Sequence, residues 1–285
     1  MAQNPTPRPP PSSPGGSTTV AVLGCGWLGL PVAERLVASG YAVRGSTTTP
    51  GTLPALASIG VEPVQVDLDT VETDALASWC RVGALVVTVP PGGVSDYPAS
   101  MERVGAAARA AGTGRVVFTS STSVYPDRDG LVTEADAGPS PEAGLGGRAR
   151  AVWGAEEALR EAVGDRLVVL RLAGLVGGGR EPGRFLAGRT GAARPEAPVN
   201  LVHQRDAVEA VVRALDAAPG AYSVAAPGHP TRRAFYTAEA RRLGLDPPTF
   251  ADERGGGKTV SARAFSDATG WRATWRPGDA VSPSG

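Results

Sequence analysis

The sequence predicts an α/β fold with a doubly wound parallel sheet and a small discontinuous C-terminal subdomain. Two observations carry this prediction. The apolar run Val20–Leu23 is followed directly by Gly24-Cys25-Gly26-Trp27-Leu28-Gly29. Apolar residues then recur at helical spacing as far as Gly40. From residue 18 onward, strand-like and helix-like patterns alternate, as they do in βαβ units. Together they indicate a Rossmann sheet.

The glycine-rich loop is a dinucleotide-binding fingerprint placed between a strand and a helix. Gly24 suits the tight turn, Gly26 lets backbone approach a pyrophosphate, and Gly29 allows close packing of helix on strand. Trp27 and Leu28 stand at the helix N-terminus, where free N–H groups attract phosphate. Because glycine supplies 38 of the 285 residues, the alternative is a turn that binds nothing.

The remaining elements follow in order. Further strands are expected over 42–46, 61–66, 84–89, 115–119, 167–172, 199–202 and 222–225. Further helices are expected over 51–58, 97–111, 148–163, 206–215 and 231–243. The stretch 174–194 is rich in Gly and Arg and is expected to be loop with a little helix.

These elements divide the chain into regions. Residues 1–17 contain six prolines with almost nothing to bury and are expected to be a disordered tail. We expect residues 18–176 to form the NAD(P)-binding domain, to which 199–225 return. The segments 177–198 and 226–285 are then the substrate-side subdomain.

Composition excludes several classes of function. The 28 basic and 28 acidic residues cancel, which argues against a nucleic-acid or anionic-membrane partner. Cys25 and Cys80 have no metal-ligand spacing, and no metal site is expected. No apolar run is long enough for a membrane span, and no signal-peptide pattern is present. A cytoplasmic protein with a small-molecule substrate, either monomer or homodimer, is the expectation.

The end of the second strand bears on cofactor choice. An NAD site usually carries an acid there for the ribose 2′-hydroxyl. Here the stretch is Arg44-Gly45-Ser46-Thr47-Thr48-Thr49, which has no acid. Because Arg44, Ser46, Thr47 and Thr48 can hydrogen-bond a 2′-phosphate, NADP is favoured, and NAD stays open. Asp67 is placed either to reach the adenine amine or to serve as a helix N-cap.

Other strand ends are expected to line the same site. Ligands of doubly wound sheets bind at the carboxyl ends of the strands. Val89, Pro90 and Pro91 follow the fourth strand, and Leu172 and Ala173 end the sixth. We expect all five to contact the cofactor.

Four motifs together resemble a known family. They are the glycine loop, the FTSSTSVY segment that ends at Tyr125, LRLAGLVG over 170–177, and VNLVH over 199–203. They are similar to the extended and atypical short-chain dehydrogenase/reductases, and most of all to the YeeZ-like atypical subgroup. The resemblance covers roughly residues 19 to 275 and implies an NAD(P)-dependent epimerase or reductase.

The resemblance also implies catalytic residues, and here the chain departs from the family. A Ser four residues before the VY tyrosine polarises the substrate oxygen in active members, which maps to Ser121. A Tyr-x-x-x-Lys pair then moves the proton, but this chain has no such pair and its only lysine is Lys258. Alignment puts Arg148 at the tyrosine position and Val152 at the lysine position.

The missing pair leaves the proton donor open. Arginine stays protonated, so Arg148 can hold an anion but is a poor proton shuttle. Tyr125, His203 or water remain as donors. Tyr125 can instead pack its ring beside the cofactor, His203 can be structural, and Asn200 can line the substrate side or satisfy loop backbone. Ser121 is the first choice as a catalytic residue.

Two functions therefore follow from the sequence. The first is an NAD(P)-dependent oxidoreductase or epimerase for a small carbonyl, hydroxyl or sugar-nucleotide substrate. The second is a non-catalytic NADP(H)-binding sensor, which the absence of the Tyr-Lys pair favours.

Overall fold

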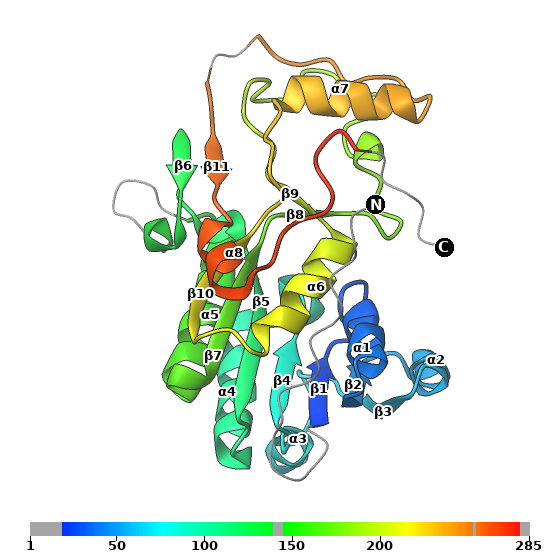
Figure 1. Ribbon diagram of the computed structural model, residues 1–285, viewed down its shortest axis with the longest axis vertical. Coiled ribbons are helices and arrows are strands. Elements are labelled where there is room, and N and C mark those ends of the chain that lie inside the picture. Colours follow the sequence, from blue (N-terminus) through cyan, green and yellow to red (C-terminus); the bar gives the residue numbers. More distant parts are fainter. Residues whose placement is uncertain (1–18, 139–144, 253–254, 280–285) are drawn as a thin grey trace.

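A computed structural model describes residues 19–138, 145–252 and 255–279. The expected disordered tail, residues 1–17, lies outside these ranges. The centre of the molecule is a seven-stranded sheet in the order β10-β7-β5-β4-β1-β2-β3, and every neighbouring pair of strands in it is parallel (Figure 1). The predicted doubly wound sheet is thereby confirmed.

The elements have the following bounds. The main sheet consists of β1 (Thr19–Leu23), β2 (Ala42–Thr47), β3 (Val61–Gln65), β4 (Ala84–Val87), β5 (Arg115–Ser121), β7 (Leu167–Leu172) and β10 (Gly220–Val224). The helices are α1 (Gly29–Ala38), α2 (Leu53–Ser58), α3 (Thr73–Trp79), α4 (Tyr97–Ala111), α5 (Gly147–Val163), α6 (Gln204–Ala214), α7 (Arg232–Arg242) and α8 (Arg263–Thr269). Two short pairs of strands lie outside the main sheet: β6 (Gly130–Val132) with β11 (Lys258–Val260), and β8 (Gly174–Val176) with β9 (Leu201–His203).

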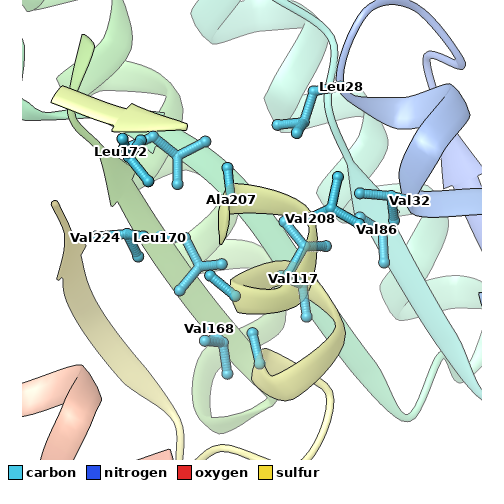
Figure 2. Packing of buried hydrophobic residues seen from close by; sticks show 14 of the residues in the cluster. Leu28, Val32, Val86, Val117, Val168, Leu170, Leu172, Ala207, Val208 and Val224 are labelled. Carbon is cyan, nitrogen blue, oxygen red and sulfur yellow. The ribbon is translucent and has the colours of Figure 1, made fainter. Parts of the chain in front are cut away.

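Both faces of the sheet are buried, as the continuous apolar strands predict. In β1, Val20 and Val22 pack into one core with α1 and α6, and Ala21 and Leu23 pack into the other core with α3, α4 and α5. Figure 2 shows the first of these cores, where Val208 of α6 lies among side chains of the central strands. The alternation of side chains along each strand fixes which helices cover which face.

A third apolar cluster lies beyond the carboxyl ends of the strands. It joins the β8–β9 pair to α7 and to Trp275 near the C-terminal end of the described chain. In Figure 1, α7 and these short strands lie above the main sheet.

The structure differs from the sequence prediction in several elements. The expected loop over 174–194 begins with strand β8, and the strand expected over 199–202 is β9, whose bounds are Leu201–His203. Helix α3 and the β6–β11 pair were not predicted. Within the described ranges, no helix combines the length and the apolar character that a membrane crossing requires.

Candidate functional site

A cavity of about 1060 Å³ lies at the carboxyl ends of the strands. It extends from the glycine-rich loop, past the ends of β2, β4 and β5, to the start of α5 and the β8 segment. Predicted site residues that line it are Gly24, Gly26, Trp27, Leu28, Ser46, Thr47, Thr48, Val89, Pro90, Pro91, Ser121, Arg148, Leu172 and Ala173. Gly29, Arg44, Asp67, Tyr125 and His203 are not among its lining residues.

The glycine loop is held in place by its neighbours. The N–H of Gly24 donates to Ser46 Oγ at 3.0 Å, and Thr88 Oγ1 donates to the Gly24 carbonyl at 2.7 Å. Gly24 has a φ of +94°, which glycine adopts without strain. A Cβ on Gly29 would lie 2.2 Å from the Gly24 oxygen, whereas a Cβ on Gly26 would meet nothing within 4 Å. Gly29 therefore serves packing, and Gly26 leaves the cavity wall open.

The loop also presents unpaired donors. The backbone N–H groups of Trp27 and Leu28 donate to no protein acceptor in the described part of the chain. They lie at the N-terminus of α1, whose first turn carries no acid. Buried N–H groups normally have a partner, so these two fit an anionic ligand such as the diphosphate of a dinucleotide.

The thiol beside these donors is not a nucleophile. Cys25 also lines the cavity, but burial raises the pKa of its thiol to about 12. The thiol therefore stays protonated, and it packs against the core as a small apolar group.

The end of β2 presents hydroxyls to the cavity but no cation. Thr47, Thr48, Thr49 and Thr52 line it. Thr47 Oγ1 accepts hydrogen bonds from the N–H of Thr49 and the hydroxyl of Thr52. These contacts orient the hydroxyls of Thr47 and Thr52.

Arg44 does not face the cavity, which corrects the expectation that it reaches a 2′-phosphate. The parallel register places Arg44 of β2 opposite Glu62 of β3. Its Nε donates to Glu62 Oε2 at 3.1 Å. Asp67 is likewise engaged locally, because its Oδ1 accepts from the N–H of Asp69 at 3.0 Å. Asp67 is not the N-cap of the helix that follows, because the N-cap of α3 is Glu72.

Ser120 and Ser121 end β5 and direct their hydroxyls to different partners. Ser120 donates to the buried carboxylate of Glu156. Ser121 Oγ accepts from the N–H of Ser123 at 3.1 Å, and its own O–H has no acceptor among the described residues. Since Ser121 lines the cavity, its proton is available to a ligand there.

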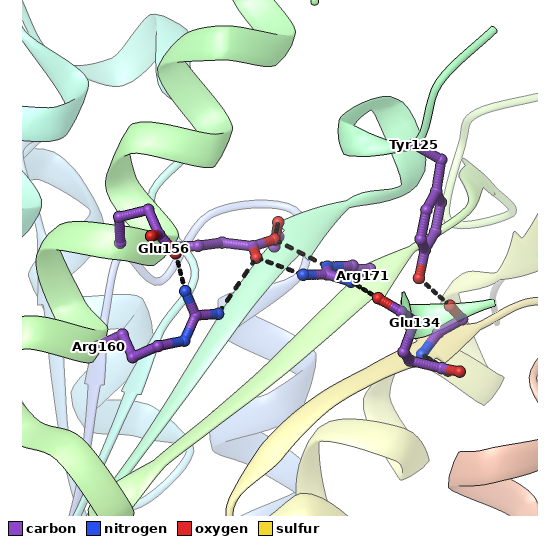
Figure 3. Close-up of polar contacts among 8 residues, drawn as sticks. Tyr125, Glu134, Glu156, Arg160 and Arg171 are labelled. Atoms are coloured by element: carbon purple, nitrogen blue, oxygen red, sulfur yellow. Dashed lines mark hydrogen bonds and ion pairs between the residues drawn. The ribbon is translucent and has the colours of Figure 1, made fainter. Parts of the chain in front are cut away.

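Tyr125 lies in the core, which argues against the alternative in which it donates a proton to substrate. Only 1% of the residue is exposed, and its hydroxyl is hydrogen-bonded to Ser223 (Figure 3). The guanidinium of Arg171 lies 5.4 Å from the ring centroid of Tyr125. Burial raises the pKa of this phenol. Its surroundings fit the packing role, although the partners are Ser223 and Arg171.

The start of α5 brings two predicted positions to the cavity. Arg148 and Val152 both line it, as the alignment with a Tyr-x-x-x-Lys pair predicts. Arg148 is exposed, and its guanidinium has no partner in the described ranges. This side chain is free to bind an anion that enters the cavity.

His203 and Asn200 make structural contacts, which is one of the alternatives that the sequence leaves open for each of them. His203 Nδ1 accepts from the N–H of Arg205 at 3.2 Å and so caps α6. The Asn200 amide donates to the Lys258 carbonyl and accepts from the N–H of Val260, both at 2.8 Å, which pins β11. Lys258 Nζ donates to the Tyr125 carbonyl at 2.8 Å.

Arg180 and Tyr97 are among the cavity residues that were not foreseen. Arg180 lines the wall beside the glycine loop, with its guanidinium carbon 3.9 Å from the ring centroid of Trp27. Tyr97 also lines the cavity, but its hydroxyl donates to the Val89 carbonyl at 2.9 Å. The only hint of Arg180 in the sequence is its place after Gly177-Gly178-Gly179.

The charges of the cavity are one-sided. Arg148 and Arg180 line it, and the described lining includes no Asp or Glu. No group of three or more metal-ligating side chains occurs in the part of the chain that the structure describes. The arrangement can therefore bind an anionic ligand at the loop and hydrogen-bond an oxygen at Ser121.

Comparison with known proteins agrees with this geometry. The model of the NAD dependent epimerase/dehydratase family matches residues 20–225. The chain is 37% identical over 263 residues to Protein YeeZ of Escherichia coli strain K12, which covers 88% of this chain and 94% of that protein.

Solved structures share the fold. A nucleoside-diphosphate-sugar epimerase from Pseudomonas aeruginosa superposes with a TM-score of 0.78 at 17% identity, covering 93% of this chain and 95% of that one. A UDP-glucuronic acid 4-epimerase from Bacillus cereus, in complex with NAD, gives a TM-score of 0.74 at 16% identity, covering 92% of this chain and 96% of that one.

Proposed function

The chain belongs to the NAD-dependent epimerase/dehydratase family, and from this premise we propose that it is an NAD(P)-dependent oxidoreductase or epimerase. Its substrate is a small hydroxyl- or carbonyl-bearing compound or a sugar nucleotide. One observation carries the proposal. A single cavity joins the unpaired N–H groups of Trp27 and Leu28 to the free hydroxyl proton of Ser121.

The residues divide into a cofactor side and a substrate side. The glycine loop and the threonines after β2 would hold the dinucleotide, and Val89, Pro90 and Pro91 would line its path toward the substrate. The bound nicotinamide supplies the hydride chemistry. Leu172 and Ala173 line the cavity near the end of β5, where the reacting carbon would lie.

Ser121 would act on the substrate oxygen. Its Oγ accepts from the N–H of Ser123, and its O–H could turn to a ligand without breaking a protein hydrogen bond. Such a donor stabilises the negative charge that develops on oxygen when a carbonyl is reduced. Arg148, at the start of the next helix, would hold an anionic group of the substrate by a charge-assisted hydrogen bond.

Proton movement differs from that of a Tyr-Lys enzyme. The hydroxyls of Tyr97 and Tyr125 are both engaged within the protein, and burial raises both of their pKa values. His203 Nδ1 is occupied by the cap of α6. Water that enters the cavity is therefore the proton source we propose.

NADP is the cofactor that we propose. The described lining has no carboxylate to repel a 2′-phosphate, and the hydroxyls after β2 can donate to one. Because Arg44 is paired with Glu62, recognition would depend on these hydroxyls alone. NAD would then bind as well, and the difference between the affinities for NADP and NAD would be smaller than in a site where an arginine contacts the 2′-phosphate.

The experiment is a turnover assay with a matched variant. NADPH and NADH are incubated with aldehydes, ketones and sugar nucleotides, and the loss of absorbance at about 340 nm is followed. We expect turnover with at least one class, and we expect Ser121→Ala to lower kcat about a hundredfold, as removal of an oxyanion donor does. Ser123→Ala, which keeps the N–H that orients Ser121, is the control.

A second function has its own support. The buried Tyr125 and the missing Tyr-Lys pair favour a cofactor-binding module without catalysis. Tight cofactor binding without turnover or epimerisation across the panel would establish that function and contradict the first.

A further inference from the structure

The guanidinium of Arg180 is placed on the glycine loop by an aromatic stack. Its central carbon lies 3.9 Å from the ring centroid of Trp27, well within the range of a cation–π contact. Arg180 lines the cavity. No side-chain or backbone acceptor for its guanidinium exists in the described chain. The charge is thus held at one place while its hydrogen-bond donors stay unused.

The segment 177–179, which precedes Arg180, is hydrogen-bonded to the glycine-rich loop. Trp27 Nε1 donates to the Gly178 carbonyl at 2.6 Å, and Gln204 Nε2 donates to the Trp27 carbonyl at 2.7 Å. Gly177 and Arg180 are joined by two backbone hydrogen bonds of 3.1 and 2.9 Å. These contacts bring the backbone of Arg180 beside Trp27, and its side chain lies over the indole.

Glycine is required at two positions of this segment. Gly177 and Gly178 have φ values of +83° and +53°. A Cβ on Gly177 would lie 2.2 Å from His203 Nε2, and one on Gly178 would lie 2.2 Å from Gln204 Oε1. Glycine at these two positions therefore allows the segment to pack closely against His203 and Gln204.

The position of the guanidinium identifies its ligand. The indole beneath it belongs to the residue whose own N–H, together with that of Leu28, lacks a partner at the start of α1. One diphosphate between these groups would satisfy two backbone donors on one side and the guanidinium on the other. The other arginine that lines the cavity, Arg148, lies instead on α5.

We propose that Arg180 binds the diphosphate of the dinucleotide cofactor, reaching it from the β8 side of the cavity over the ring of Trp27. This inference rests on the cofactor binding of the proposed function, and it adds a donor that lies far from the fingerprint in the sequence. Trp27 is the positioning residue, because it fixes the guanidinium. The same contacts join the cofactor loop to the segment 177–180, which follows β8.

The test measures binding rather than turnover. Dissociation constants of the full-length protein for NADPH, ADP-ribose and adenosine are measured by quenching of tryptophan fluorescence and by calorimetry. We expect Arg180→Gln to weaken NADPH and ADP-ribose about tenfold, the effect of one charge-assisted hydrogen bond, and to change adenosine less than twofold. The affinity for NADPH should also depend less steeply on salt in the variant, because one cation–phosphate contact is lost.

Two further variants separate the roles. Arg189→Gln removes an exposed arginine that does not line the cavity and should leave all three constants unchanged. Trp27→Ala should weaken NADPH, and Arg180→Gln should then cost much less in the Trp27→Ala background, because the two residues act together. Far-UV circular dichroism and the midpoint of thermal unfolding establish that each variant is folded.

The possible outcomes separate the two proposals. If Arg180→Gln raises the substrate KM but leaves the constants for NADPH and ADP-ribose within twofold of the wild type, Arg180 faces the substrate and the inference is overturned, while the proposed function stands. If the wild-type protein binds neither NADPH nor NADH, the proposed function fails first, and the inference fails with it.

Discussion

Glu156 and Arg171 form a bidentate ion pair in the core of the protein. Arg171 Nε and Nη2 donate to the two carboxylate oxygens of Glu156, at 3.1 and 2.8 Å (Figure 3). The two residues are 0% and 2% exposed, respectively. The pair ties α5, which begins at Gly147, to β7, and Ser120 at the cavity wall donates to the same carboxylate. The ion pair therefore helps to position both walls of the substrate end.

Removing one partner of this pair should be severely destabilising. Glu156→Ala leaves Arg171 buried without its counter-charge, which typically costs about 3–5 kcal/mol. We expect urea unfolding to show a loss of that order in the free energy of unfolding. The double variant Glu156→Leu/Arg171→Met should lose less than either single variant, because no charge remains unpaired.

A surface pair provides the control for that comparison. Arg263 and Asp267 are 3.3 Å apart, with side chains 86% and 62% exposed. Asp267→Ala should cost less than about 1 kcal/mol. A loss at Glu156 no greater than the loss at Asp267 would contradict the structural role of the buried pair.

The missing proton donor can be restored by design. Arg148 and Val152 line the same cavity four residues apart on α5, so Arg148→Tyr/Val152→Lys creates the Tyr-x-x-x-Lys arrangement there. The lysine stem can replace the apolar contacts of Val152 while its ammonium reaches the cavity. If proton transfer limits turnover, kcat should rise at least tenfold and acquire a pH dependence. Arg148→Phe/Val152→Lys, which lacks the hydroxyl, should show neither effect.

Substitutions at the end of β2 should change the ratio of the affinities for NADP and NAD. Thr47→Asp places a carboxylate where the 2′-phosphate of NADP would lie, and it should weaken NADP at least about tenfold while NAD binds as before. Arg44→Ala should leave the ratio of the two affinities unchanged, because Arg44 is engaged by Glu62. Thermal shifts with each cofactor measure both ratios. A change of the ratio in Arg44→Ala alone would instead place Arg44 at the phosphate.

Features encoded in neighbouring residues could be predicted from the sequence. The apolar run before Gly24 and the alternation of strands and helices predicted the sheet, because local periodicity carries that information. Seven residues of α3 hold too few apolar positions for a clear helical pattern. That helix could therefore not be predicted from the sequence.

Features that depend on distant contacts could not be predicted. The contact of Arg44 with Glu62 follows from strand register, and that of Trp27 with Gly178 spans 151 positions. The pairing of β6 with β11 is equally non-local. Ser121 was found because its sequence motif was recognised, whereas Arg180 belongs to no motif and becomes visible only when the chain folds back on the loop.

The stability of the protein should depend on pH through His203. Burial lowers the pKa of this ring below its ordinary value of 6.5, and its Nδ1 must be unprotonated to accept from the N–H of Arg205. The native state thus prefers the neutral ring, and the unfolded chain binds more protons as pH falls below about 6.5. Burial lowers the pKa of His229 in the same direction. The stabilising contribution of both residues is present above pH 6.5 and is lost as pH falls through their folded pKa values.

Substitution isolates that contribution. His203→Asn keeps a side-chain oxygen that can cap α6 but cannot be protonated, so urea unfolding between pH 7 and pH 5 should show a smaller decline in stability than in the wild type. His203→Asn/His229→Gln should reduce the decline further. Asp69 and Asp136 do not obscure the comparison, because their pKa values are lowered from 3.8 and they lose their contribution only in stronger acid. Equal declines in the wild type and the double variant would show that neither ring is responsible.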